Sequence, residues 1–172
     1  RLLAERPHDA LLRALDFSGA PALPEVHRSP AQIEAARQFR QWAQDNGQSD
    51  LVALCNRYAE QSQGGTTRLL NGPTGERNSY SLLPRDHVLC LAAEERDLQA
   101  QLAAVMAVGS EAVVAESAVS NALLGKLPPA VQKRITRIAD WTSDTARFAF
   151  VLHHGHPDQL RDVSQHLARR SG

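Results

Sequence analysis

The sequence lacks an excess of either charge, a long apolar run and a rich supply of aromatic side chains. Its 19 basic residues balance 19 acidic residues, and aromatics make up 5% of the 172 residues. A net charge near zero supplies no long-range field to attract nucleic acid or an anionic membrane. No stretch approaches the roughly 20 apolar residues that span a bilayer, and no signal peptide or lipidation motif is found. We therefore expect no nucleic-acid binding, no membrane insertion and a cytoplasmic protein.

Cysteine is also scarce, because Cys55 and Cys90 are the only two. Both lie in apolar, periodic segments, whereas a catalytic thiolate needs an exposed, electropositive setting. We therefore expect two reduced, buried thiols and no catalytic residue. The chain begins at Arg1 and its single methionine is Met106, which predicts a piece cut from a longer protein.

The first part of the chain, residues 1–64, is predicted to be helical. Leu3–Phe17 reads as a short helix, and Ser18–Pro24, rich in small residues and proline, reads as a linker. Ser29 followed by Pro30 is typical of a helix start, and a second helix is expected over Ser49–Gln61. In the first of these two helices one set of residues follows at helical spacing: Ile33, Ala36, Phe39, Arg40 and Ala43.

Residues 65–86 change pattern and predict a β-hairpin. Thr66–Leu70 and Asn78–Leu83 favour extended backbone, and the glycine- and proline-rich run of residues 71–75 between them favours a tight turn.

Residues 87–172 alternate between short apolar strands and helices, which predicts an α/β fold with a Rossmann-like parallel sheet covered by helices on both faces. The predicted strands are His87–Ala92, Ala112–Ala115, Arg134–Ile138 and Phe148–Leu152. The predicted helices are Glu94–Val108, Ser117–Leu124 and Pro157–Arg169, with a helical turn opened by Pro128–Pro129. The last helix is expected to turn Leu160, Val163 and Leu167 inward.

The run Gly72–Asn78, followed by Tyr80 and the strand around Cys90, resembles the proline utilization A family. In long members a similar run opens a C-terminal domain of aldehyde-dehydrogenase-superfamily-like fold. The helix segment Leu102–Gly109 and the opening residues Arg1–Pro7 are similar to that family too.

The resemblance implies a bifunctional parent that oxidises proline to glutamate. Such a parent carries an FAD-dependent proline dehydrogenase and an NAD-dependent L-glutamate gamma-semialdehyde dehydrogenase. It also implies that the C-terminal domain keeps the dehydrogenase fold without its chemistry, covers the dehydrogenase site and helps to enclose the channel between the two sites. We therefore expect other domains of the parent chain as partners, a possible homo-oligomer, and no activity from this piece alone.

The residues offer no recognisable NAD site. A dinucleotide fold of the common type needs a glycine-rich turn after its first strand, so that the backbone approaches the pyrophosphate. Here Leu91 is followed by Ala92–Ala93–Glu94–Glu95, which has no glycine and places two acids at the helix start. Aldehyde dehydrogenases use a lysine after the second strand, and Ala115–Glu116–Ser117 has none. We expect no cofactor in this piece, and an NAD- or ligand-binding regulatory module is the alternative.

Two further clusters invite a function. His153, His154 and His156 have metal-binding side chains, but adjacent histidines in a strand point to opposite faces, so we expect a solvated strand-to-helix loop and no metal. Glu76, Arg77 and Asn78 flank the glycine turn, where charged hydrogen bonds tie loops to neighbouring backbone. We expect these three residues to dock the hairpin onto another domain.

Overall fold

The computed structural model describes residues 28–73, 76 and 78–170. The helix expected over Leu3–Phe17 and the linker expected over Ser18–Pro24 lie outside the described residues. The chain divides into two compact units, which are taken separately below. One contains the hairpin region, residues 63–83, and the other contains residues 29–62 together with the chain from Pro84 onward.

The hairpin unit confirms the predicted pair of strands. Strand β1 (Thr67–Leu70) pairs antiparallel with β2 (Asn78–Ser81), and Leu70 lies opposite Asn78 where the loop begins. The hydroxyl oxygens of Thr67 and Ser81 lie 2.8 Å apart at the other end of the ladder. All four residues of β2 are exposed, so the ladder holds the strands together without forming a core.

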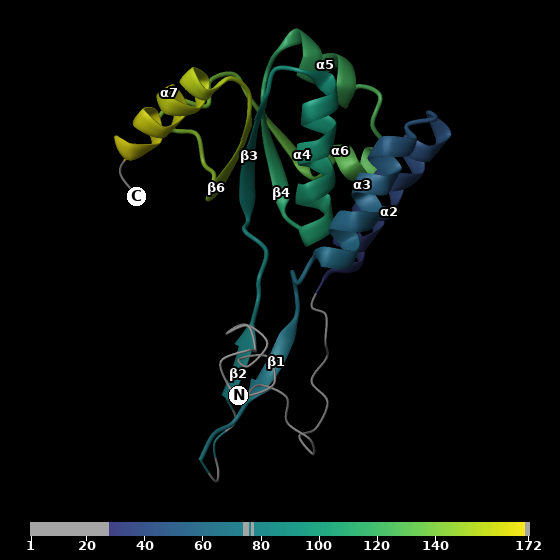
Figure 1. Cartoon of the computed structure of the whole chain (residues 1–172), viewed down its shortest axis with the longest axis vertical. Helices are drawn as coiled ribbons and strands as arrows, with labels where there is room; N and C mark the ends of the chain where they lie inside the picture. Colours follow the sequence, from purple (N-terminus) through teal and green to yellow (C-terminus); the bar gives the residue numbers. More distant parts are fainter. Residues whose placement is uncertain (1–27, 74–75, 77, 171–172) are drawn as a thin grey trace, which may run out of the picture. The chain divides into compact units, whose positions relative to one another are not determined.

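The second unit is built around a four-stranded parallel sheet, which confirms the predicted Rossmann-like α/β fold. Strands β3 (His87–Ala92), β4 (Glu111–Ala115), β5 (Ile135–Ile138) and β6 (Phe150–His154) are arranged in the order β5-β4-β3-β6. The chain therefore moves outward from β3 through β4 to β5 and then returns to the other side of β3 (Figure 1). This order matches strands 3-2-1-4 of the classic dinucleotide-binding fold, in which the direction reverses between strands 1 and 4.

The two central strands are apolar on both faces because both faces are covered. Side chains of adjacent residues point to opposite faces, yet Val88, Leu89 and Cys90 are all buried, as are Ala112, Val113 and Val114. Such continuous apolar runs are what predicted a covered sheet.

Helix α4 (Glu95–Val108) packs beside the sheet and carries the expected inner residues Leu98, Leu102, Val105 and Met106, all of which are buried. Gly109 ends it with a φ of 84°, a left-handed conformation that glycine adopts without a steric penalty. Two short helices, α5 (Ala118–Leu124) and α6 (Pro129–Gln132), follow β4.

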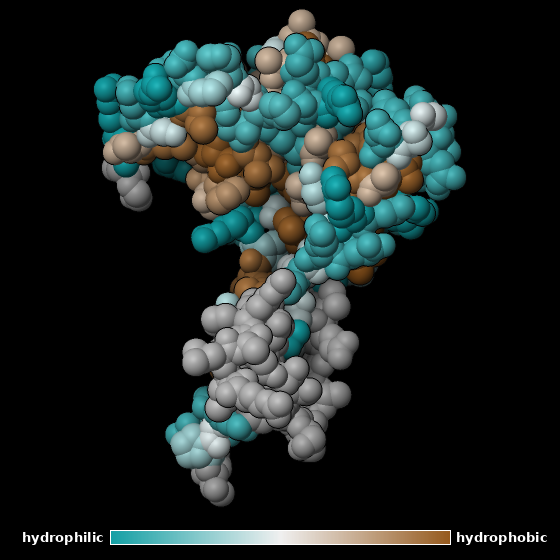
Figure 2. All heavy atoms as spheres, viewed as in Figure 1, coloured by the Kyte–Doolittle hydropathy of each residue, from teal (hydrophilic) through white to brown (hydrophobic). Residues whose placement is uncertain are grey.

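Helix α7 (Pro157–Ala168) departs from the prediction on one side chain. Val163 is buried, but Leu160, which was expected to point inward, is 50% exposed. The prediction was wrong at Leu160 because the described part of the chain supplies no surface to cover that end of the helix. Figure 2 shows hydrophobic atoms gathered along the lower side of α7 and over β6.

Helices α2 (Pro30–Asp45) and α3 (Ser49–Gln61) form a hairpin that packs on α4. Ser29 and Gln32 cap α2 reciprocally, and the side-chain amide of Gln32 donates to the Gly109 carbonyl at 2.8 Å. Of the residues at helical spacing, Ile33 and Arg40 are exposed. The buried side instead follows a spacing of four through Ala35, Phe39 and Ala43.

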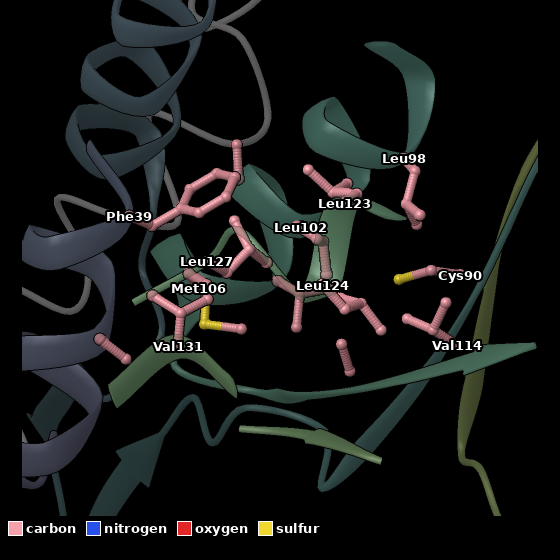
Figure 3. Packing of buried hydrophobic residues seen from close by; sticks show 14 of the residues in the cluster. Phe39, Cys90, Leu98, Leu102, Met106, Val114, Leu123, Leu124, Leu127 and Val131 are labelled. Atoms are coloured by element: carbon pink, nitrogen blue, oxygen red, sulfur yellow. The ribbon is translucent and has the colours of Figure 1, made fainter. Parts of the chain in front are cut away.

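One apolar core joins these elements (Figure 3). Phe39 from α2, Leu102 from α4 and Leu123 from α5 are each fully buried in it, together with Val131 from α6. Within the described residues, no helix is both long enough and apolar enough to cross a membrane.

Candidate functional site

The chain reversal places a crevice at the carboxyl ends of β3, β4 and β6. In open α/β sheets ligands bind at this point, because the connections from the two neighbouring strands run in opposite directions and leave a gap. A cavity of about 520 Å³ lies there in the second unit. Its walls come from the strand ends, from the loop before β6 and from α7, and include Ala92, Ala115, Trp141, His153 and His166.

The wall formed by α4 does not suit a phosphate. The turn between β3 and α4 contains Ala92 and Ala93 rather than glycine, and the first turn of α4 carries the carboxylates of Glu95 and Asp97. The N-terminus of a helix attracts anions through its free N–H groups, but these acids already interact with that dipole and repel a pyrophosphate. The start of α4 therefore has neither the glycine turn nor the free, uncharged surroundings that a bound pyrophosphate requires.

The wall at the end of β4 is occupied by its own hydrogen bonds. Ser117 and Ser120 form a capping box at the start of α5, and the Ser120 hydroxyl also donates to the Ala115 carbonyl at 2.9 Å. No lysine lies between β4 and α5, where the aldehyde dehydrogenase pattern would require one. The hydroxyls on this wall are therefore committed to holding the helix start.

The three histidines of residues 153–156 do not converge. The prediction that they form a strand-to-helix loop was wrong for His153 and His154, because β6 continues to residue 154 and pairs these two residues with Leu91 and Ala92. His154 Nδ1 lies 3.2 Å from Asp97 Oδ1, which joins the end of β6 to the start of α4. His156 is the N-cap of α7 and accepts from the Asp158 N–H at 3.4 Å.

The described part of the chain contains no cluster of three or more histidine, cysteine or acidic side chains that could hold a metal ion. Two of the three histidines are used instead in a contact with Asp97 and in a helix cap.

The outer wall contains residues that sequence reasoning did not assign to the crevice. Trp141 meets His166 edge-on with ring centroids 5.0 Å apart, and His166 Nε2 is buried with no hydrogen-bond partner among the described residues. Gln159 and Val163 line the same wall. The spacing of residues 159, 163 and 166 places them on one face of a helix. The sequence does not indicate which face of that helix lies toward the sheet, so it could not assign these residues to the crevice.

The loop that carries Trp141 is fixed by two sets of contacts. Thr142 donates to Asp140 through both its N–H and its hydroxyl, and the hydroxyl bond in particular lowers the pKa of the Asp140 carboxyl. From the end of α7, the Arg170 guanidinium donates to the carbonyls of Trp141, Ser143 and Ala146. The crevice wall is therefore attached to the C-terminal end of α7.

Neither cysteine supplies a nucleophile. Burial raises the pKa of Cys90 to about 12 and that of Cys55 to about 11, so both thiols are protonated near neutral pH. Cys90 contributes to the wall of the cavity but is only 2% exposed, and its Sγ–H donates to the Val88 carbonyl at 3.7 Å. The crevice thus offers apolar contact and imidazole groups, without a phosphate cradle or a reactive thiolate.

The predicted docking residues belong to the other unit. Glu76 is exposed, and its N–H donates to the Pro73 carbonyl at 3.0 Å within the loop. Asn78 opens β2, and a Cβ added at Gly72 would come within 2.9 Å of the Asn78 side chain, which explains a glycine there. Arg77 lies outside the described residues. Glu76 in the loop and Asn78 at the start of β2 are therefore both exposed at this end of the hairpin.

The whole chain is similar to part of a group of larger proteins. It is 43% identical to the bifunctional protein PutA of Escherichia coli and 41% identical to that of Klebsiella aerogenes, over its full length in both cases. The PutA of Rhizobium meliloti is 31% identical over 89% of the chain. No family model matches the chain.

The chain spans only about 13% of the length of the Escherichia coli and Klebsiella aerogenes relatives, so most of each relative lies outside the matched segment. The identity over the full chain confirms the resemblance carried by residues 72–78. This chain is therefore similar along its whole length to a segment of the bifunctional PutA proteins of Escherichia coli and Klebsiella aerogenes.

Proposed function

We propose that the chain is a non-catalytic C-terminal module of a cytoplasmic PutA, which covers the aldehyde dehydrogenase site and the substrate channel of its parent. The parent oxidises proline to glutamate with FAD and NAD bound to other domains. The observation that carries the proposal is a nucleotide-fold crevice that has no glycine-rich turn before α4, has the acids Glu95 and Asp97 in the first turn of that helix, and has a buried thiol, Cys90, that stays protonated. Such a crevice favours a structural role, because a fold does not by itself imply its usual function.

The hairpin supports a docking role. A two-stranded sheet is marginally stable by itself in water, and β1 and β2 bury little of their own surface. Tyr80 is 51% exposed and Leu83 is 74% exposed. A hairpin with uncovered apolar side chains and a polar tip suits attachment to a neighbouring domain. In this proposal Glu76, Arg77 and Asn78 make the polar contacts of that attachment.

The proposal predicts a selective defect in the complete parent enzyme. Replacing Glu76 and Asn78 together by alanine should lower kcat/KM for glutamate-semialdehyde oxidation by about tenfold, equivalent to about 1.4 kcal/mol of lost docking energy. Proline oxidation, measured on the same preparation with an artificial electron acceptor, should stay within twofold of the unaltered enzyme.

Ser79→Ala provides a matched control, because Ser79 is also exposed and lies between strand residues of β2. An equal loss of both activities would indicate general unfolding and would contradict the docking role. Unchanged semialdehyde oxidation in the double variant would contradict it as well.

A second function is favoured by the cavity itself, since 520 Å³ at a chain reversal is large enough for part of a small ligand. In that case the chain is a regulatory module that binds NAD or another small molecule. Calorimetric titration of the chain with NAD separates the two functions. Heat that fits a micromolar dissociation constant supports the regulatory module, and no binding at millimolar NAD supports the structural one.

A further inference from the structure

The chain contains two asparagine–glycine pairs, Asn46–Gly47 and Asn71–Gly72. Asparagine is one of the thermolabile residues of proteins, because its side-chain carbonyl carbon can be attacked by the backbone nitrogen of the next residue. Glycine in that next position leaves the approach unhindered, since it has no side chain and permits a wide range of backbone angles. The two pairs therefore share one intrinsic reactivity, and the local structure decides which of them reacts.

The pair Asn46–Gly47 is held by hydrogen bonds in the turn between α2 and α3. Asn46 is the C-cap of α2, and its side-chain amide donates to the Trp42 carbonyl at 2.8 Å, which turns that amide back along the helix. The Gly47 N–H donates to the Gln44 carbonyl at 3.0 Å. Attack by the Gly47 nitrogen on the Asn46 side chain requires both bonds to break together, so the folded turn protects this pair.

The pair Asn71–Gly72 lies at the tip of the β1–β2 hairpin, just beyond the paired residues Leu70 and Asn78. Asn71 and Gly72 are both exposed, and neither forms a hydrogen bond with another described residue. A Cβ added at Gly72 would come within 2.9 Å of the Asn78 side chain. The hairpin therefore needs glycine at the position that makes Asn71 reactive, and it supplies no bond that would restrain the reaction.

We propose that Asn71 is a site of spontaneous deamidation, which converts it to aspartate and isoaspartate, while the turn between α2 and α3 protects Asn46. The Gly72 nitrogen forms a bond to Cγ of Asn71, and the bond from Cγ to Nδ2 breaks. Ammonia leaves with the proton that was on the Gly72 nitrogen. Water from the solvent then opens the resulting cyclic imide at either of its two carbonyls, so the reaction needs no oxidant, reductant or enzyme.

Deamidation changes both the charge and the main chain at the tip of the hairpin. Either product adds a negative charge to the loop that already carries Glu76. Isoaspartate also routes the main chain through the former side chain, which lengthens it by a methylene group. Because Asn71 directly follows Leu70, whose partner is Asn78, this extra length enters where the two strands separate. The modification therefore alters the loop and the adjoining end of the β1–β2 ladder.

Peptide mapping by mass spectrometry tests the assignment on the whole chain. The chain is incubated at mildly alkaline pH, folded in buffer or unfolded in guanidinium chloride, and is then cut with trypsin. Asn71 is the only residue with a side-chain amide in the tryptic peptide 69–77, and fragmentation locates conversion at Asn46. In the unfolded chain both asparagines should convert at similar rates. In the folded chain Asn71 should stay within about threefold of that rate, whereas Asn46 should slow at least about tenfold, because it reacts only when its turn opens.

Two results would overturn the proposal: a folded chain in which Asn71 slows as much as Asn46, and a folded chain in which both convert equally fast. Asn71→Gln is the matched control variant, because glutamine keeps an amide but forms its larger cyclic imide much more slowly. Peptide 69–77 of this variant should stay unmodified over the period in which the unaltered peptide converts. Conversion at the unaltered rate in the variant would also contradict the assignment.

The deamidation site and the docking role fail separately. In the complete PutA protein, docking of the loop through Glu76 and Asn78 should slow conversion of Asn71 relative to the isolated chain, because the docked loop reacts only when it opens. An unchanged rate in the complete protein contradicts docking of the loop and leaves the modification site intact. Slow conversion in the isolated chain refutes the site, and semialdehyde oxidation by the Glu76 and Asn78 variant then still decides the docking role.

Discussion

The two helices that flank the crevice, α4 and α7, differ sharply in how much of their surface the chain buries. Eight of the 14 residues of α4 are buried, against one of the 12 residues of α7. On one side α4 meets the sheet, and on the other it meets the α2–α3 hairpin. The comparison teaches that the described part of the chain covers most of α4 and leaves the apolar stripe of α7 largely exposed.

The largest expected effect comes from truncating a leucine on each helix, one buried and one exposed. Leu102→Ala on α4 empties a fully buried position and should lower the free energy of unfolding by about 3 kcal/mol. Leu160→Ala on α7 removes a half-exposed side chain and should cost less than about 1 kcal/mol. Urea unfolding of the chain measures both. Similar losses would mean that the two helices are equally well packed, and the comparison would fail.

The next effect concerns the contact that holds α7 to the crevice wall. Arg170 donates to three carbonyls of the loop and places its guanidinium carbon 4.6 Å from the centre of the Phe148 ring. Arg170→Ala should destabilise the loop by about 2 kcal/mol, since hydrogen bonds from a charged donor are stronger than neutral ones. Amide exchange across residues 141–146 should accelerate roughly thirtyfold, by the same free energy.

Arg169→Ala is the matched control, because Arg169 has the same side chain, neighbours Arg170 and is exposed. It should leave exchange in the loop within about twofold of the unaltered chain. Equal acceleration by both variants would show that charge near the end of α7, rather than the contacts of Arg170, holds the loop.

The side of the fold around α4 was also the more predictable one. Short-range signals determine it: Ser29 and Pro30 start a helix, Gly109 ends one, and the apolar run around Leu89 can only be a covered strand. These signals act within a few residues, so the sequence contains them in full. The same is true of the hairpin, whose loop composition predicted a turn between two extended segments.

The predictions that were wrong required knowledge of distant contacts. Leu160 lies on an apolar stripe, and only the arrangement of neighbouring elements decides which residues of that stripe are covered. The crevice wall was missed for the same reason, because Trp141 and His166 come from a loop and a helix 25 residues apart in the numbering and meet only after folding. Histidines that suggested a loop instead extend β6, where pairing with β3 outweighs their weak strand preference.

The smallest expected effect is the difference in stability between two N-cap variants, one at the start of α2 and one at the start of α7. Ser29 caps α2 with its hydroxyl 3.3 Å from the Gln32 N–H, and Gln32 returns a bond to the Ser29 N–H at 2.7 Å. Ser29→Ala should therefore cost about 1 kcal/mol. His156 caps α7 with a longer bond of 3.4 Å at an exposed site, so His156→Ala should cost only a few tenths of a kcal/mol. The urea midpoints of the two variants measure this difference in unfolding free energy, provided that the dependence of free energy on urea concentration is the same in both. A larger loss of unfolding free energy from His156→Ala than from Ser29→Ala would show that α7 depends on its cap for stability. It would contradict the expectation from burial that the cap of α2 contributes more than the cap of α7.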